Sequence, residues 1–131
     1  VIHNSDKRVP IPSYIFKINQ LLISIQPKDF AFIGEDNLSD IFEVFARFNS
    51  KIHLMQNSAI SFSVCIDDEG TKTEALIQEL QKGFKLLYNS GLELLTIRNY
   101  DQPTIDKLLE NKTVLMEQRS RNTVQMVLSN N

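Results

Sequence analysis

The hydrophobic pattern of this chain changes its period several times, and each change marks a predicted element. The clearest strand covers residues 60–66, where Ile60, Phe62, Val64 and Ile66 alternate with serine and cysteine. One face of this strand is expected to be buried and the other to carry small polar groups. Weaker patterns predict further strands at residues 14–18, 21–26, 52–56, 92–98, 113–118 and 123–128.

Three other segments show helical periodicity. In the first, apolar residues recur every three or four positions between Leu38 and Phe48, and Asp36 or Asn37 can cap its start. The second is predicted to begin at the capping box of Thr71 and Glu74 and to continue through residue 87 towards a glycine stop at residue 91. The third covers residues 103–111.

The connection formed by residues 27–37 is longer than the roughly 2–6 residues that usually join a strand to a helix. Long connections in compact units often carry function. The helix start behind it offers backbone N–H groups that suit a carboxylate or phosphate. Three interpretations are open for the charges of Glu35, Asp36 and Asp40. They are surface groups favoured by the helix dipole, which is the default, or one of them holds the ammonium group of a free amino acid. The third, less favoured, is a catalytic acid–base pair or a magnesium site.

The order of elements predicts an α+β fold built from ferredoxin-like βαββαβ modules, with antiparallel sheets and helices on one face. Residues 13–91 form the first module. Residues 92–131 form a second, incomplete module, which lacks a closing helix and strand and must borrow from the first module or from a second copy of the chain. Residues 1–12, with prolines at positions 10 and 12, are predicted to be a linker.

Composition narrows the function further. A net charge of −2 argues against nucleic-acid binding, and no apolar run is long enough for a membrane helix. Cys65 is the sole cysteine, so an intrachain disulfide and a thiolate metal cluster are excluded, and a reduced cytoplasmic setting fits. Its place in an apolar run predicts a packed thiol.

No catalytic constellation is found in the sequence. His53 has no second histidine at metal-ligand spacing and is interpreted as a packed or edge residue. Ser58, Ser61 and Ser63 lack a base partner, and the four glycines are too scattered for a phosphate loop. The charged run at residues 117–121 could bind an anion, but its default interpretation is a solvated hairpin tip.

Four stretches together resemble the C-terminal regulatory region of aspartate kinases: FKINQLLISI, IFEVFARFNSKIHLMQNSAISFSVCID, LELLTIRNYDQPTI and VLMEQRSRNTVQMVL. The most specific part is QNSAISFS. The resemblance implies two ACT modules, a homodimer, and a free amino acid bound at the interface. Binding would inhibit ATP-dependent phosphorylation of aspartate by an N-terminal kinase domain of the same chain. That domain would use ATP and Mg²⁺, whereas this fragment is expected to have no catalytic residue, metal or cofactor of its own.

The resemblance also implies the effector-binding residues. They comprise the loop and helix start, Ala31, Ile33, Gly34, Glu35, Asp36, Asn37 and Leu38, and the strand beyond the helix, Ile52, His53, Asn57 and Ser58. Lysine-sensitive relatives often have an aspartate in the place of His53. Either Glu35 or Asp36 supplies that charge here, or the effector is another amino acid, or none binds. The first hypothesis is therefore a lysine sensor, with threonine as the alternative effector. The second is a dimerisation scaffold without a working effector site.

Overall fold

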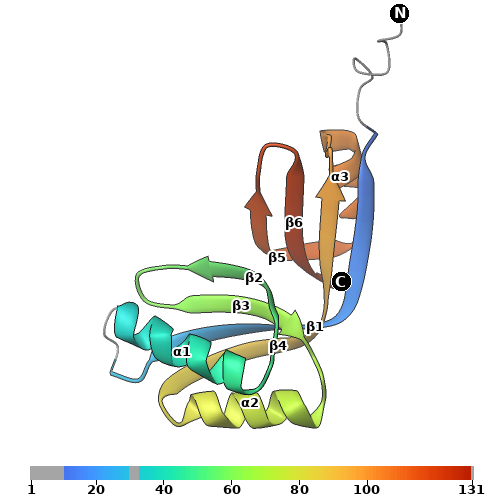
Figure 1. Ribbon diagram of the computed structural model, residues 1–131. Coiled ribbons are helices and arrows are strands. Elements are labelled where there is room, and N and C mark those ends of the chain that lie inside the picture. The colour runs from blue at the N-terminus through green and yellow to red at the C-terminus, as the bar shows by residue number, and fades with distance from the viewer. Residues whose placement is uncertain (1–10, 30–32, 131) are drawn as a thin grey trace, which may run out of the picture. The chain divides into compact units, whose positions relative to one another are not determined.

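The structure is a computed structural model that describes residues 11–29 and 33–130 (Figure 1). Along the chain it contains β1 (Ser13–Pro27), α1 (Glu35–Arg47), β2 (Ile52–Asn57), β3 (Phe62–Asp67), α2 (Thr71–Gln81), β4 (Phe84–Arg98), α3 (Gln102–Leu108), β5 (Lys112–Arg119) and β6 (Thr123–Asn130). β3 pairs antiparallel with both β1 and β2, and β5 pairs antiparallel with β6. The predicted α+β class is confirmed.

The contacts group the chain into two compact units. The central unit is Lys17–Glu93, and the terminal unit combines the described residues before position 17 with those after position 93. Both β1 and β4 run through the two units, so each strand contributes one part to each unit. The predicted module boundaries at residues 13–91 and 92–131 stay a prediction, and the predicted linker lies almost wholly outside the described residues.

The central unit has the βαββαβ order of a ferredoxin-like module, with strand order β2-β3-β1-β4. Alternate residues of β1 and β3 point to the same side, and both helices pack there (Figure 1). Their core includes Leu21, Ile23 and Ile25 from β1, Val64 and Ile66 from β3, Ile41 and Phe45 from α1, and Leu76 and Leu80 from α2. The alternation seen in the sequence thus has its expected cause, since one face of each strand is covered by helices.

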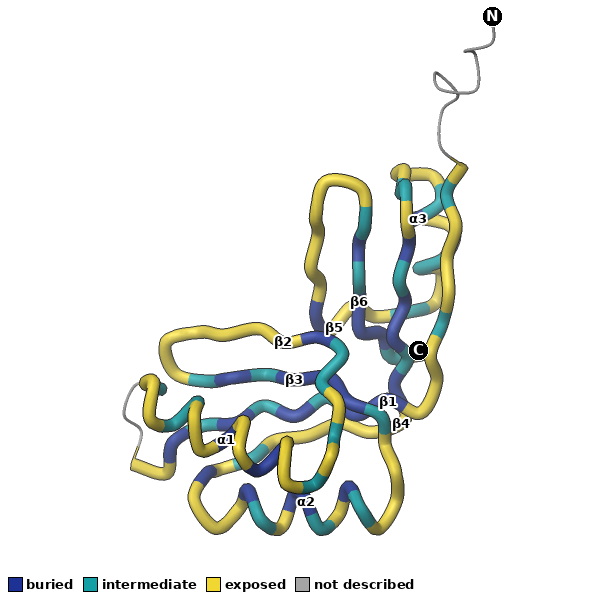
Figure 2. Tube along the Cα trace, in the orientation of Figure 1, coloured by how far each residue is buried: buried dark blue, intermediate teal, exposed yellow. Residues whose placement is uncertain are grey.

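The terminal unit has strand order β1-β4-β6-β5, and its first strand is the start of β1. The part of β4 that follows residue 93, together with α3, β5 and β6, supplies only a βαββ sequence. The segment before position 17 therefore provides the fourth strand from the opposite end of the chain. Its core is formed by Leu95, Ile97, Ile105, Val124, Met126 and Leu128, all of them at most 2% exposed. Figure 2 shows how burial concentrates in the strands while the β5–β6 turn is exposed.

One strand boundary and one helix boundary were predicted wrongly. The two strands expected at residues 14–18 and 21–26 are one strand, because Asn19 takes a left-handed conformation (φ 55°) within β1 instead of turning the chain. The second helix does not reach Leu87: α2 ends at Gln81, and Phe84 begins β4. Phe84 is buried, and Leu86 packs against the same core at strand spacing. Gly91 (φ 68°) lies inside β4 and ends no helix.

The helix starts also differ from those predicted. Gly34 is the N-cap of α1, so Asp36 and Asn37 lie in the first turn and cap nothing. Gly70 is the N-cap of α2 and has no side chain to form the expected capping box of Thr71 and Glu74. Thr73 Oγ1 instead accepts a hydrogen bond from the Glu69 N–H at 2.7 Å. Both errors have one cause: a glycine with suitable backbone angles stands one or more positions ahead of the polar cap candidate.

Candidate effector site

The first turn of α1 lies beside the turn that joins β2 to β3. The Ile33 N–H donates a hydrogen bond to the Ala59 carbonyl oxygen at 2.9 Å, which ties the segment before α1 to this turn. Ser58 folds the turn by accepting the Ser61 N–H on its Oγ at 3.2 Å and donating its own N–H to the Ser61 carbonyl at 2.9 Å. The structure thus brings one group of predicted effector residues together: Ile33, Gly34, Glu35, Asp36, Asn37 and Leu38 on one side, and Asn57 and Ser58 on the other.

The remaining predicted residues do not join this group. Ile52 and His53 lie at the far end of β2, about 16–20 Å from Ser58 along an extended strand. Ile52 is partly buried and packs against the helix-side core. Ala31 lies outside the described residues. One free amino acid cannot touch both ends of β2 within a single copy of the unit.

A hollow of about 360 Å³ borders α1 on the side of the β1 end. Its lining consists of Pro27, Lys28, Asp29, Asn37, Asp40, Gly83 and Phe84. Asn37 and Asp40 are three positions apart on α1 and therefore share one face of the helix. The turn between α2 and β4 closes the hollow with Gly83 and the buried Phe84. All of these residues belong to the central unit.

The charges in this hollow are mixed. Lys28 Nζ donates to the Lys82 carbonyl oxygen at 3.2 Å, which holds the ammonium group at the rim, and an ammonium group has two further N–H donors. Asp29 and Asp40 supply two carboxylates, and Asn37 supplies an amide that can both donate and accept. One cation and two anions around a space of this size complement a small ligand with one carboxylate and two ammonium groups.

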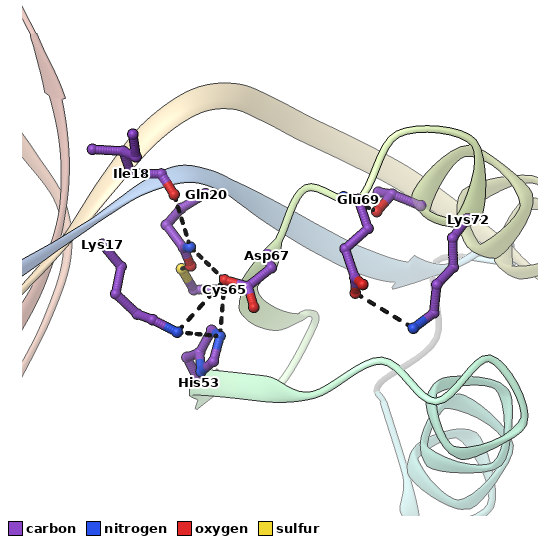
Figure 3. Close-up of polar contacts among 9 residues, drawn as sticks. Lys17, Ile18, Gln20, His53, Cys65, Asp67, Glu69 and Lys72 are labelled. Atoms are coloured by element: carbon purple, nitrogen blue, oxygen red, sulfur yellow. Dashed lines mark hydrogen bonds and ion pairs between the residues drawn. The ribbon is translucent and has the colours of Figure 1, made fainter.

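His53 lies in a second polar cluster of the central unit, shown in Figure 3. The pairing of β2 with β3 is irregular between Ile52 and Leu54, and this bulge turns the histidine towards the end of β3. Its Nε2 lies 3.1 Å from Asp67 Oδ1. Lys17 Nζ lies 3.8 Å from the same oxygen and 3.5 Å from the histidine nitrogen. The sequence interpretation of His53 as a packed or edge residue therefore agrees with its partners.

Gln20 connects this cluster to the buried thiol of Cys65. Its Nε2 donates to Asp67 Oδ1 at 2.7 Å, and its Oε1 accepts from Cys65 Sγ at 3.4 Å (Figure 3). The Gln20 amide, followed by His53 and Lys17, holds the pKa of Asp67 below its ordinary value. Burial, with the Asp67 charge nearby, raises the pKa of Cys65 to about 12. The thiol stays protonated near neutral pH and is packed, as the sequence predicted.

This second cluster is complete in itself. Asp67, Gln20, His53 and Lys17 satisfy one another, and within the described part of the chain no buried side-chain nitrogen or oxygen lacks a partner. No group of three or more metal-ligating side chains occurs among residues 11–29 and 33–130. The cluster therefore fixes the end of β2 against β3 and β1, and the hollow beside α1 is the better candidate for a ligand.

The sequence reasoning missed most of this hollow. Only Asn37 belongs to both the predicted set and the lining. Asp40 was considered with Glu35 and Asp36 as a partner for the ammonium group of an amino acid, but it was not among the predicted effector residues. Lys28 and Asp29 directly follow the proline that ends β1, and adjacent opposite charges at a strand end were a usable signal. Gly83 and Phe84 could not be found, because the sequence placed both inside a helix.

The central unit, with α1 and α2 on one face of its strands, and the terminal unit, with α3 packed on its core, define a fold of ACT-type modules. No family model matches the sequence, and no curated protein is similar to it in sequence. Solved structures are similar in fold. A protein from Porphyromonas gingivalis W83, proposed to be a C-terminal regulatory domain of aspartate kinase, matches over 89% of this chain and 85% of its own, with 15% identity and a TM-score of 0.73.

Two whole kinases match as well. Aspartate kinase from Clostridium acetobutylicum has a TM-score of 0.71 and 16% identity over 89% of this chain. Aspartokinase III from E. coli, in complex with lysine and aspartate, has a TM-score of 0.67 and 17% identity over 88% of this chain. The chain spans 30% and 28% of these two proteins. Its fold is thus that of the aspartate kinase regulatory domain, as the sequence resemblance implied. In the part of the chain that is described, no helix is long and apolar enough to cross a membrane.

Proposed function

We propose that this chain is the amino-acid-sensing regulatory region of a cytoplasmic aspartate kinase and that it binds free lysine in the hollow beside α1. The observation that carries the proposal is the set of charges around one space: the ammonium group of Lys28 and the carboxylates of Asp29 and Asp40. The regulatory-domain fold supports it, and so does the lysine in the complex of E. coli aspartokinase III.

Charge matching favours lysine over threonine. Free lysine carries one carboxylate and two ammonium groups, which would face Lys28, Asp40 and Asp29 in turn. Threonine carries one ammonium group, so it could contact only one of the two aspartates in this way. The predicted residues of the α1 start, from Ile33 to Leu38, would form the wall next to this hollow.

Regulation would follow from a second copy of the chain. In this proposal two copies form a dimer, the bound amino acid favours one arrangement of the modules, and an N-terminal kinase domain responds to it. A coupling free energy of about 1–3 kcal/mol is enough for strong feedback inhibition. The ligand must bind the two arrangements with different affinity, because otherwise no equilibrium shifts.

Isothermal titration of the chain with lysine and with threonine tests the site. We expect lysine to bind more tightly than threonine, and Asp40→Asn to weaken lysine binding about tenfold or more, because it removes a charged hydrogen-bond acceptor. Glu43→Gln is the matched control, since it removes a carboxylate from the exposed side of the same helix. Equal loss in both variants would show that net charge, not the hollow, controls binding.

The alternative function is a dimerisation scaffold. It predicts that neither amino acid produces heat at millimolar concentration while light scattering still reports a dimer. Asp36→Asn separates the hollow from the site predicted by sequence, because Asp36 is exposed on the first turn and does not line the hollow. Loss of lysine binding in Asp36→Asn with full binding in Asp40→Asn would move the site to the position that the sequence indicated.

A further inference from the structure

The helix-free face of the terminal unit contains a polar hollow of about 520 Å³. It is lined by Thr96, Arg98, Asn99, Asn122, Thr123 and Gln125. A neighbouring hollow of about 330 Å³ shares Thr96 and Arg98 and is closed by Ser13, Tyr14 and Ile15 of β1. Arg98 and Thr96 therefore border both spaces.

Strand alternation explains why polar groups gather here. Leu95 and Ile97 of β4 point into the core with Val124 and Met126 of β6, so the residues between them face the other side. On that side the polar side chains of the two strands are not scattered but line one hollow. Gln125 Nε2 donates to Thr96 Oγ1 at 3.4 Å and joins the two strands through their side chains.

The backbone fixes the end of the hollow. The Asn99 N–H donates to the Asn122 carbonyl oxygen at 2.5 Å, immediately after β4 and immediately before β6. Asn99 adopts a left-handed conformation, with φ 55°, which asparagine tolerates better than most residues. The two asparagine side chains are thereby held at one edge of the space that Arg98 borders.

Arg98 brings the only charge in this lining. The other five residues around the larger hollow are neutral, and so are Ser13, Tyr14 and Ile15 around the smaller one. In the described part of the chain, no carboxylate forms an ion pair with Arg98, whereas Arg47 pairs with Glu43 and Glu79, and Arg119 pairs with Glu117. A guanidinium group without a carboxylate offers two parallel N–H donors to a carboxylate or phosphate.

We propose that this hollow is a second ligand site, for a small organic anion whose carboxylate or phosphate lies on Arg98. The hydroxyl and amide groups of Thr96, Asn122 and Thr123 would hydrogen-bond the polar remainder of the ligand. This site belongs to the other unit and has the opposite charge balance from the hollow beside α1, which has two carboxylates and one ammonium group. It does not depend on whether that first hollow binds lysine.

The test is a titration of the whole chain at low ionic strength, where a surface guanidinium is least screened. Succinate serves as the carboxylate probe and inorganic phosphate as the phosphate probe, and the backbone amide signals in ¹⁵N NMR spectra report the position of binding. We expect at least one probe to shift the signals of Thr96, Asn122 and Thr123 in a saturable way. The probe that saturates at the lower concentration identifies the anionic group that the site prefers.

Two variants decide whether Arg98 holds the ligand. Arg98→Gln should weaken binding by about ten- to a hundredfold, because it removes the charged donor. Arg121→Gln makes the same change of charge in the exposed β5–β6 turn, outside both linings, and should bind like the natural chain. Failure of both probes to saturate at millimolar concentration would overturn the proposal. Equal weakening by the two variants, or shifts confined to the β5–β6 turn, would overturn it as well.

Discussion

The imidazole of His53 lies 3.1 Å from the Asp67 carboxylate. A β-bulge in β2, which gives this strand one extra residue opposite β3, makes the contact possible. Between Ile52 and Leu54 the strand advances by two residues while β3 advances by one. Without this bulge, the register between β2 and β3 would differ by one residue, and the side chains at the start of β2 would point to the opposite face of the sheet. His53, which the resemblance implied as an effector residue, thus has a carboxylate partner within its own sheet.

The first prediction concerns acid stability. The pKa of Asp67 is held below its ordinary value of 3.8, so its ionised form is the one that the fold stabilises. This contribution is fully present above pH 3.8 and is lost as the pH falls through the lower pKa of the folded state. Asp67→Asn should remove it and lower the free energy of unfolding at neutral pH by about 0.5–1 kcal/mol, a modest amount because the side chain is partly exposed.

Urea unfolding followed by circular dichroism at a series of pH values measures this effect. Asp106→Asn is the control. Asp106 is an exposed residue of α3, and its carboxylate accepts a hydrogen bond from the Gln102 amide of the same helix. The control should keep the acid-dependent loss of stability. An Asp67→Asn variant with an unchanged acid limb would show that the Gln20 and His53 contacts do not stabilise the ionised form.

The second prediction concerns the reactivity of Cys65. The side chain is fully buried, and its pKa is raised to about 12, so neither access nor thiolate formation favours reaction. Ellman's reagent at about pH 8 should label the native chain far more slowly than the urea-unfolded chain. The unfolded chain, which has one thiol, is the internal control for the full signal. Rapid stoichiometric labelling of the native chain would contradict the packing at this site.

The third prediction compares two isoleucines that differ in burial. Ile66 is fully buried in the core of the central unit, whereas Ile60 is 58% exposed in the β2–β3 turn. Ile66→Ala should lower the free energy of unfolding by about 2–5 kcal/mol, because it removes buried methyl groups and leaves a cavity. Ile60→Ala should change it by less than about 0.5 kcal/mol. Urea unfolding of both variants measures the difference, and similar losses would place Ile60 in a packed environment.

The fourth prediction concerns Gly91, which has a φ of 68° inside β4. A β-carbon at this position would meet no atom within 4 Å, so any cost of Gly91→Ala comes from the backbone conformation alone. We expect a loss of about 1–2 kcal/mol, the cost of a left-handed conformation for an L-residue. Gly83→Ala is the matched control, because that position has equal space and no positive φ. Thermal unfolding of the two variants should differ, and equal midpoints would argue against the left-handed conformation.

Local pattern was enough to predict most elements of this protein. The alternation in β3, the apolar stripe of α1 and the polar turn between β5 and β6 each depend on which residues lie next to one another in the chain, so one sequence reveals them. The α+β class followed from the order of these elements. The resemblance to aspartate kinase regulatory regions, made from the same stretches, agrees with the fold.

The two proposed sites depend on tertiary structure. Lys28, Asp40 and Gly83 border one hollow although they are far apart in the chain. Arg98 borders a second hollow with Thr123 and a neighbouring third one with Tyr14. The resemblance to aspartate kinase regulatory regions implied that His53 and Ser58 share a site, but the extended strand β2 separates the two residues within one copy of the unit. A linear chain specifies its own spacing and periodicity, whereas the meeting of distant residues depends on strand register and helix packing, which only the folded molecule fixes.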